Sequence, residues 1–221
     1  MIGERVELAR VARGMSQRDL GSAIGVSPMA ISKIESGQSI PTFETLRAIC
    51  DATKLSPSFF DRQSLHLPPP LYRRRSSLGK KALKHVEALG SLQVEAILCA
   101  WDSAGIRLPV RTRNLAGSTP EDAAIATRRL LGLPDDKPVD HLLAALEQAG
   151  CVVHQLAHSD ERLDGFSTVH SDRPVIILGP GREGGGDRQR MTAAHELAHT
   201  VLHQRGGVEH SQAETEADQF A

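Results

Sequence analysis

One stretch decides the fold of the second half of the chain: residues 189–203, which read QRMTAAHELAHTVLH. Its apolar residues recur at the spacing of a helix that is buried along one side. His195 and His199 lie four residues apart, so a helix projects both imidazoles from one face, one turn apart. Two imidazole nitrogens placed in this way can share one Zn²⁺ ion, so the stretch predicts a core helix with a zinc site.

Glu196 follows the first histidine, and this position gives it a chemical role. Zinc lowers the pKa of a water that it binds from about 15.7 to about 7. A carboxylate beside that water can accept its proton and later pass it to the leaving amine of a cleaved peptide. We therefore expect Glu196 to be a catalytic residue. The alternative is that these three side chains merely share a solvated helix face.

The residues around this helix predict a small sheet covered by further helices. Apolar runs at 151–156, 166–169 and 175–178 are typical of strands, and residues 171–174 are typical of a turn. Helical spacing covers 119–131 and 139–149, and a last helix begins at Ser211 or Glu214. The strand at 175–178 either holds an extended peptide by strand addition or simply packs in the core.

Residues 120–221 resemble the ImmA/IrrE-type metallopeptidase domain. The resemblance rests on four segments: LDGF at 163–166, PVIIL at 174–178, residues 187–203, and ETEADQFA at 214–221. It implies a zincin-like fold with one Zn²⁺ held by His195, His199 and Glu216, with Glu214 as the alternative third ligand. Asp218 would orient a ligand histidine. The resemblance further implies a gluzincin-like endopeptidase that cleaves a repressor-like protein in stress or mobile-element control.

Several details of this half are left open by the sequence. His203 extends the histidine row, but a position at the surface or behind the ligands suits it better than ligation. The motif names no donor for the reaction's oxyanion, and Arg190, His203 and His210 are the candidates. The family's last helix normally runs beyond the Phe220–Ala221 end, so we expect the chain to be truncated there.

A second decisive stretch lies in the first half, residues 16–37, SQRDLGSAIGVSPMAISKIESG. Ser16 can cap one helix, Gly25 suits a sharp turn, and Ser27 followed by Pro28 can begin a second helix. The second helix of such a helix-turn-helix lies in the major groove of DNA, with the side chains at its start against base edges.

Residues 3–61, including GQSIPTFETL at 37–46, resemble the XRE (Cro/CI-type repressor) family. The resemblance implies operator DNA as a partner, with six contact residues: Gln17 at phosphate or a base edge, Arg18 at phosphate, and Ser27, Pro28, Met29 and Lys33 facing the groove. Because repressors of this type usually read two half-sites, we expect a homodimer. The alternative is a helical domain that only dimerises or binds protein.

The middle of the chain separates the two halves. Residues 65–71, LHLPPPL, predict a stiff linker because consecutive prolines cannot lie within a helix, and residues 82–101 predict one long helix. Residues 64–115 carry nine Lys or Arg against three Asp or Glu, whereas residues 116–221 carry nine against 17. The basic residues Arg73, Arg74, Arg75, Lys80, Lys81 and Lys84 either contact DNA phosphates or form a solvated linker.

Composition narrows the class of protein. The chain is 40% hydrophobic with few aromatic residues, so aliphatic side chains fill its core. Cys50, Cys99 and Cys151 are odd in number and far apart, which is typical of free thiols in a reducing compartment. The N-terminus lacks a signal-peptide pattern, and no apolar run approaches a membrane span. We expect a soluble, cytoplasmic protein with no membrane partner.

These patterns predict an α+β, mainly helical chain in three parts. Residues 1–63 form an all-α helix-turn-helix domain, 64–118 a basic linker with a long helix, and 119–221 a zincin-like domain with a small sheet and the HExxH helix. The favoured hypothesis is a DNA-binding transcriptional regulator that carries a Zn²⁺-dependent peptidase. The alternative is a non-enzymatic transcription factor whose zincin-like domain senses metal, peptide or a small ligand.

Overall fold

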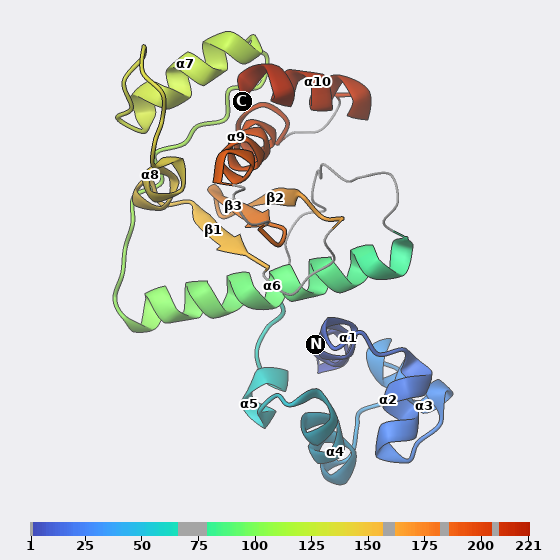
Figure 1. Cartoon of the computed structure of the whole chain (residues 1–221). Coiled ribbons are helices and arrows are strands. Elements are labelled where there is room, and N and C mark those ends of the chain that lie inside the picture. Colours follow the sequence, from blue (N-terminus) through green and yellow to red (C-terminus); the bar gives the residue numbers. More distant parts are fainter. Residues whose placement is uncertain (1, 66–78, 157–161, 182–185, 205–207) are drawn as a thin grey trace. The chain divides into compact units, whose positions relative to one another are not determined.

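The computed structural model describes residues 2–65, 79–156, 162–181, 186–204 and 208–221 (Figure 1). The chain divides into two compact units, residues 1–66 with 79–92 and residues 67–78 with 93–221. The proline-rich segment and the run Arg73–Arg75 lie outside the described residues, apart from Leu65. The fold is mainly helical with one small sheet, as the sequence predicts.

Short helices and the start of a long one build the first unit. Their bounds are α1 Ile2–Ala12, α2 Gln17–Ile24, α3 Pro28–Glu35, α4 Phe43–Thr53, α5 Pro57–Phe60 and α6 Lys80–Ser103, of which residues 80–92 belong to this unit. A small core of fully buried aliphatic side chains, among them Val6, Leu20, Ile31 and Ile49, holds these helices together.

The turn between α2 and α3 is defined by its caps. Ser16 and Asp19 exchange hydrogen bonds between side chain and backbone at the start of α2, which satisfies two otherwise orphaned donors. Gly25 ends the helix with a φ of 74°, a conformation that other residues rarely adopt. Ser27 caps α3 through the backbone N–H of Ala30. The predicted helix-turn-helix therefore forms where the sequence places it.

A three-stranded sheet in the order β1-β3-β2 is the centre of the second unit. β1 (Val152–Gln155) runs parallel to β3 (Arg173–Leu178), and β2 (Gly165–His170) runs antiparallel to it. The expectation that residues 175–178 bind a peptide by strand addition is wrong. β3 is the central strand, so its backbone groups already pair with both neighbours, and only its core role holds.

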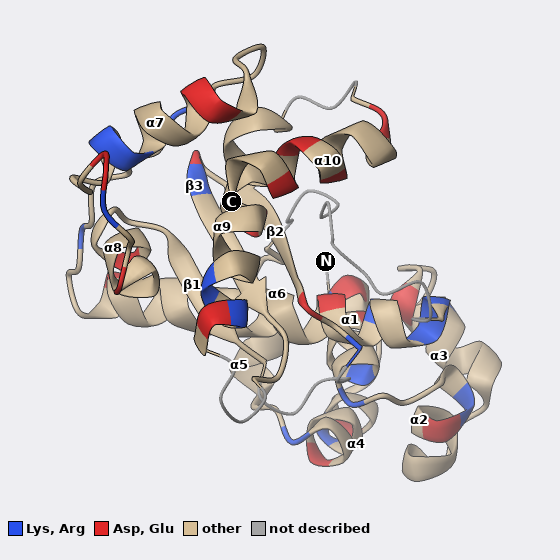
Figure 2. Cartoon of the chain, turned by 45° about the horizontal axis from the view of Figure 1, so that its top comes forward, with Lys and Arg blue, Asp and Glu red and all other residues tan. Residues whose placement is uncertain are grey.

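The second unit also contains residues 93–103 of α6 and the helices α7 Pro120–Leu130, α8 Leu142–Gln148, α9 Gly186–Leu202 and α10 His210–Phe220. α9 packs against β2 and β3, and α10 and α7 pack against α9. Leu146, Ile176, Leu197 and Val201 lie in the common core. α10 contains several acidic residues, which are the red segments of its ribbon in Figure 2. Within the described residues, no helix is both long and apolar enough to span a membrane.

Candidate functional site

α9 buries a row of polar side chains that a core helix would normally exclude. His195 and Glu196 are fully buried, and His199 and His203 are 2% and 3% exposed. Their spacing of four residues stacks the three imidazoles along one face of the helix. Buried polar groups persist only where they are bonded to partners, so the surroundings of this row decide its purpose.

Two of these imidazoles and one carboxylate converge on a single point. The Nε2 atoms of His195 and His199 lie 3.1 Å apart. Glu214 on α10 places its Oε2 atom 3.4 Å from Nε2 of His195 and its Oε1 atom 3.4 Å from Nε2 of His199. Within the described residues, this is the group of histidine and acidic side chains arranged to hold a metal ion.

In His195 and His199, the second ring nitrogen, Nδ1, lies at hydrogen-bond distance from another side chain. Nδ1 of His195 lies 2.9 Å from Oδ1 of Asp218. Nδ1 of His199 lies 3.0 Å from Nδ1 of His203, whose Nε2 lies 2.9 Å from Oε2 of Glu216. When the rings are neutral, a carboxylate that accepts an N–H hydrogen bond at each end of this series sets the tautomers of the imidazoles.

The positions of the protons in these hydrogen bonds explain why the cluster fits a cation. His195 donates from Nδ1 to Asp218, so its Nε2 carries a lone pair. A neutral His203 that donates to Glu216 from Nε2 must accept from Nδ1 of His199, and Nε2 of His199 then also carries a lone pair. The buried Oε1 atom of Glu214 accepts no hydrogen bond within the described residues. Three acceptors that face one another without a proton are costly unless a positive ion lies between them.

The dimensions of the cluster suit zinc. Zn²⁺ binds histidine nitrogen and carboxylate oxygen at about 2.0–2.1 Å in a tetrahedron, whose ligand atoms are then about 3.3 Å apart. The observed separations of 3.1, 3.4 and 3.4 Å match that edge length. The residues present therefore fit the ion that the spacing of His195 and His199 predicts.

Burial and charge hold the ligand atoms in the required protonation states. Burial lowers the pKa of His199, which favours the neutral imidazole that binds metal. Burial alone would raise the pKa of Glu214, but the two imidazoles of His195 and His199 beside it outweigh burial and lower that pKa. A hydrogen bond with His203 lowers the pKa of Glu216. Both carboxylates are thus ionised at neutral pH.

The structure places Glu216 elsewhere than the resemblance implies. Ala213 and Ala217 form the buried stripe of α10. At 100° per residue, Glu214 and Asp218 flank one side of that stripe and Glu216 flanks the other. Glu214 therefore meets His195 and His199, while Glu216 meets His203. Asp218 lies against His195, which is one of the histidines that the resemblance names as metal ligands.

Glu196 is positioned by the edge of the sheet. The hydroxyl of Ser167 on β2 donates to Oε2 of Glu196 at 2.7 Å. Gly165 lets β2 approach, because a Cβ there would lie 3.3 Å from Cγ of Glu196 and 3.0 Å from the carbonyl oxygen of Ile177. Sequence reasoning missed Ser167, although a small polar residue at an inward-facing strand position opposite the HExxH helix is a usable signal.

The candidate oxyanion donors are engaged elsewhere. Arg190 forms an ion pair with Asp187 and donates to the carbonyl oxygens of Val139 and Asp140. His203 is held between His199 and Glu216. His210 is the first residue of α10 and exposed. These contacts identify none of the three side chains as the hydrogen-bond donor to the oxyanion.

The residues expected to read DNA lie at the surface of the first unit. Arg18, Ser27, Pro28 and Lys33 are exposed, and Met29 is 66% exposed although it is apolar. Gln17 is half-buried because its side-chain amide donates to Glu35 at 2.7 Å. Glu35 is in turn paired with Arg10, whose Nε lies 2.5 Å from Oε1. This buried pair ties α1 to the end of α3.

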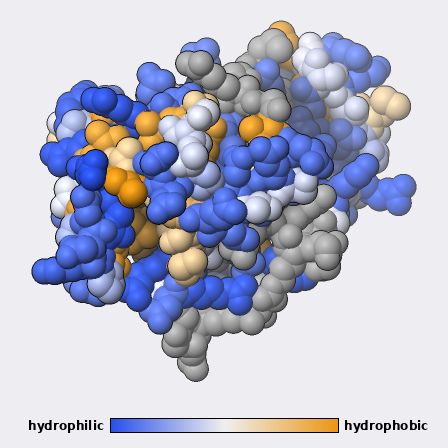
Figure 3. All heavy atoms as spheres, turned by 90° about the horizontal axis from the view of Figure 1, so that it is seen from above, coloured by the Kyte–Doolittle hydropathy of each residue, from blue (hydrophilic) through white to orange (hydrophobic). Residues whose placement is uncertain are grey.

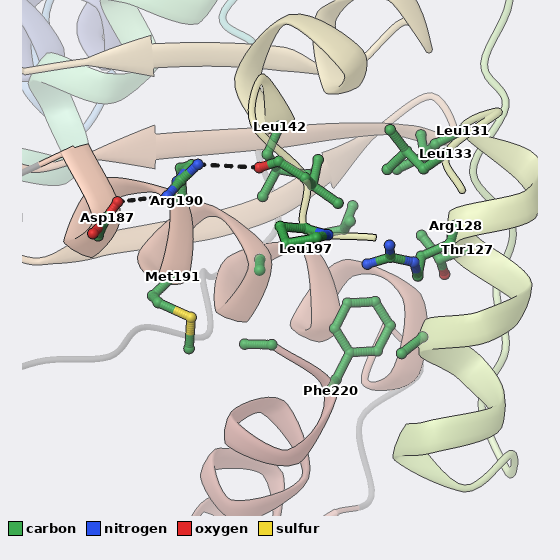
Figure 4. A pocket seen from close by; sticks show the side chains of 15 residues that line it. Thr127, Arg128, Leu131, Leu133, Leu142, Asp187, Arg190, Met191, Leu197 and Phe220 are labelled. Carbon is green, nitrogen blue, oxygen red and sulfur yellow. Dashed lines mark hydrogen bonds and ion pairs between the residues drawn. The ribbon is translucent and has the colours of Figure 1, made fainter. Parts of the chain in front are cut away.

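A separate apolar pocket of about 430 Å³ lies on another side of α9 (Figure 4). α7, α8, α9 and the end of α10 contribute its walls, which include Leu131, Leu142, Met191, Leu197 and Phe220. Apolar side chains also gather on the left of the space-filling view, where α7 and α8 lie (Figure 3). Leu197, which lines this pocket, lies between His195 and His199 in the sequence.

Comparison with known families agrees with both halves of this description. A family model described as helix-turn-helix matches residues 6–60, and one described as the IrrE N-terminal-like domain, Peptidase M78, matches residues 146–221. No curated protein and no solved structure matches the sequence at the threshold of significance. These two matches support a DNA-binding type of domain in the first half of the chain and a metallopeptidase type of domain in the second. Residues 6–60 are thus similar to the helix-turn-helix family and residues 146–221 to the IrrE N-terminal-like family, the same order of domains that the sequence predicts.

Proposed function

We propose that this chain is a transcriptional regulator whose second unit is a zinc endopeptidase acting on a repressor-like protein. The observation that carries this proposal is the convergence of His195, His199 and Glu214 beside Glu196. A regulatory role in stress or mobile-element control, and a homodimer that reads two half-sites, belong to the same proposal.

The residues divide the peptidase chemistry among themselves. His195, His199 and Glu214 would hold Zn²⁺, which when bound lowers the pKa of water and polarises the substrate carbonyl. Glu196 accepts a proton from the attacking water and delivers it to the leaving nitrogen, since both transfers need one carboxylate within reach. Ser167 fixes the orientation of that carboxylate through the hydrogen bond to Oε2. Asp218 and His203 hold the ligand rings in place.

The first unit would recognise the DNA sequence at which the regulator binds. We expect α3 to lie in the major groove, with Ser27, Pro28, Met29 and Lys33 toward the bases. Pro28 and Met29 offer only apolar contact, which suits a thymine methyl group. At the start of α2, Arg18 would contact the phosphate backbone, and Gln17 would contact phosphate or a base edge. Selection from random duplexes, followed by titration of a Lys33→Ala variant, tests this assignment.

One variant separates the enzymatic proposal from its alternative. Glu196→Gln should bind zinc as the wild type does, because Glu196 is not a ligand, but should cleave nothing. Proteins from cells that express either form are compared by mass spectrometry for new N-termini. New N-termini that require Glu196 support the peptidase. Identical N-termini together with unchanged gene regulation by Glu196→Gln contradict it.

The apolar pocket favours a second candidate function, a sensor of a small apolar ligand. A ligand between Leu131, Leu142 and Phe220 would press on α9, the helix that carries both histidines. Thermal unfolding with a library of small apolar compounds tests this function. A compound that raises the melting temperature of the wild type, but not of a Leu142→Gln variant, supports it. Equal effects on both proteins contradict it.

A further inference from the structure

A basic cleft lies beside the start of α2, within the first unit. The cleft has a volume of about 810 Å³, and its walls come from the end of α1, the start of α2, Pro28 and the first turns of α6. Lys80, Lys81 and Lys84 of α6 line one side, and Gln17 and Arg18 of α2 line the other. The residues expected to contact DNA phosphates therefore share a surface with three further cations.

The first turns of α6 are anchored to α1. The Nδ1–H of His85 donates to the carbonyl oxygen of Val11 at 2.8 Å. Val86 is 1% exposed and Ala88 is 7% exposed, so this part of α6 has a buried side. The lysines that precede them are therefore held at a defined place beside α2, unlike lysines on an unanchored linker.

The three lysines form one exposed group of positive charges. Lys84 lies four residues after Lys80 and three after Lys81, so the side chains share one side of the helix. In the described part of the chain, none of them forms an ion pair with a carboxylate. Glu7 is the one carboxylate among the residues that line the cleft, and Arg10 is already paired with Glu35.

The charge of Lys81 also reaches the first turn of α2. Hydrogen bonds from Ser16 lower the pKa of Asp19, and the charges of Lys81 and Arg18 lower it further. Lys81 and Arg18 thus place positive charge within electrostatic reach of the surface where α2 begins. Such a surface attracts a polyanion with regularly spaced charges.

We propose that Lys80, Lys81 and Lys84 contact the phosphate backbone of DNA at the side of the helix-turn-helix where α2 begins. The proposal rests on the proposed function, because it needs α2 and α3 to lie on DNA. These contacts add affinity without reading sequence, since phosphates carry no base information. They extend the interface from the residues of α2 and α3 onto α6.

The dependence of DNA binding on salt tests the proposal without knowledge of the operator. A labelled 24-base-pair duplex of random sequence is titrated with the full chain at several salt concentrations. Each phosphate contact contributes about 0.9 to the slope of log K against log salt. The triple variant Lys80→Gln, Lys81→Gln, Lys84→Gln should therefore lower the slope by roughly 2 to 3. Replacing all three lysines with arginine should restore it.

A matched control removes three exposed cations elsewhere: Lys54→Gln, Arg113→Gln and Lys137→Gln. This control should keep the wild-type slope, and both triple variants should keep the wild-type melting temperature because the side chains are exposed. An unchanged slope in the α6 variant overturns the inference while DNA binding by α3 stands. Loss of binding to a poly-glutamate peptide without a change in the DNA slope also overturns it, in favour of an acidic protein partner. A wild-type chain that binds no DNA refutes the proposed function itself.

Discussion

The hydroxyl of Ser167 donates to Oε2 of Glu196 across 2.7 Å, and both side chains are buried. The strand residue thereby sets the direction in which the carboxylate faces. A hydrogen bond to a charged group contributes about 1.5–3 kcal/mol, so its loss has a measurable effect.

We expect Ser167→Ala to lower the cleavage rate about 10- to 100-fold, the factor equivalent to that free energy. Zinc content should not change, because neither residue is a ligand. The rate is measured on a substrate found through the Glu196→Gln comparison, and metal content by mass spectrometry. Ser118→Ala removes an exposed hydroxyl and is the control. A variant that loses zinc would show that Ser167 supports the cluster and not the base.

The two glutamates of α10 should behave differently when each is replaced. Glu214→Gln should lose most bound zinc, because the cluster keeps only two ligands. Glu216→Gln should keep one zinc per chain but bind it about 10- to 100-fold more weakly, since it only supports His199 through His203. Competition with a metal chelator measures both affinities. Equal losses in the two variants would mean that the cluster is not assembled in this way.

The sequence predicts the part of this site that local geometry determines. His195, Glu196 and His199 follow from helical spacing alone, and Asp218 follows from the resemblance. The choice between Glu214 and Glu216 depends on how α10 is rotated against α9. Burial of Ala213 and Ala217 sets that rotation, which is a matter of tertiary packing. The expected contact of Asp218 with His195 or His199 already favours Glu214 over Glu216, because Glu214 lies one helical turn before Asp218 on the same side of α10.

The central place of β3 illustrates the same limit for the fold. The apolar run of residues 175–178 indicates a strand but does not say which strands flank it. Pairing with β1 and β2 comes from contacts between residues far apart in sequence. The helix-turn-helix was easier to predict because its caps depend on local sequence: Ser16 and Ser27 each accept a hydrogen bond from a backbone N–H three residues later.

The ion pair of Arg10 and Glu35 should be important for the stability of the first unit. Its side chains are only 10% and 6% exposed. Arg10→Met leaves the charge of Glu35 buried without its cation, and we expect a loss of about 3–5 kcal/mol in the free energy of unfolding. Replacing both residues with apolar ones should cost less. Urea denaturation measures these free energies.

An exposed ion pair supplies the control for that measurement. Arg107 and Asp102 are paired, with side chains 70% and 77% exposed. Arg107→Gln should cost less than about 1 kcal/mol, because water screens the pair. If Arg10→Met proved no more damaging than Arg107→Gln, the Arg10–Glu35 pair would not contribute to stability.

Cys151 should make the stability of the second unit depend on alkaline pH. The side chain is fully buried, and burial raises the pKa of its thiol to about 12. An unfolded thiol has a pKa near 9. The stabilisation that the buried, neutral thiol gives to the folded state is therefore fully present below pH 9. It is lost as the pH rises toward 12, at up to about 1.4 kcal/mol of unfolding free energy per pH unit.

Because other groups also titrate, the informative quantity is the difference in unfolding free energy between the wild type and Cys151→Ala. That difference should shift by about 1.4 kcal/mol against the wild type between pH 8 and pH 10, measured by urea denaturation. Cys99→Ala, at a partly exposed position, serves as the matched control. A difference that stays constant across this range would mean that the Cys151 thiol ionises equally well in the folded and unfolded chains.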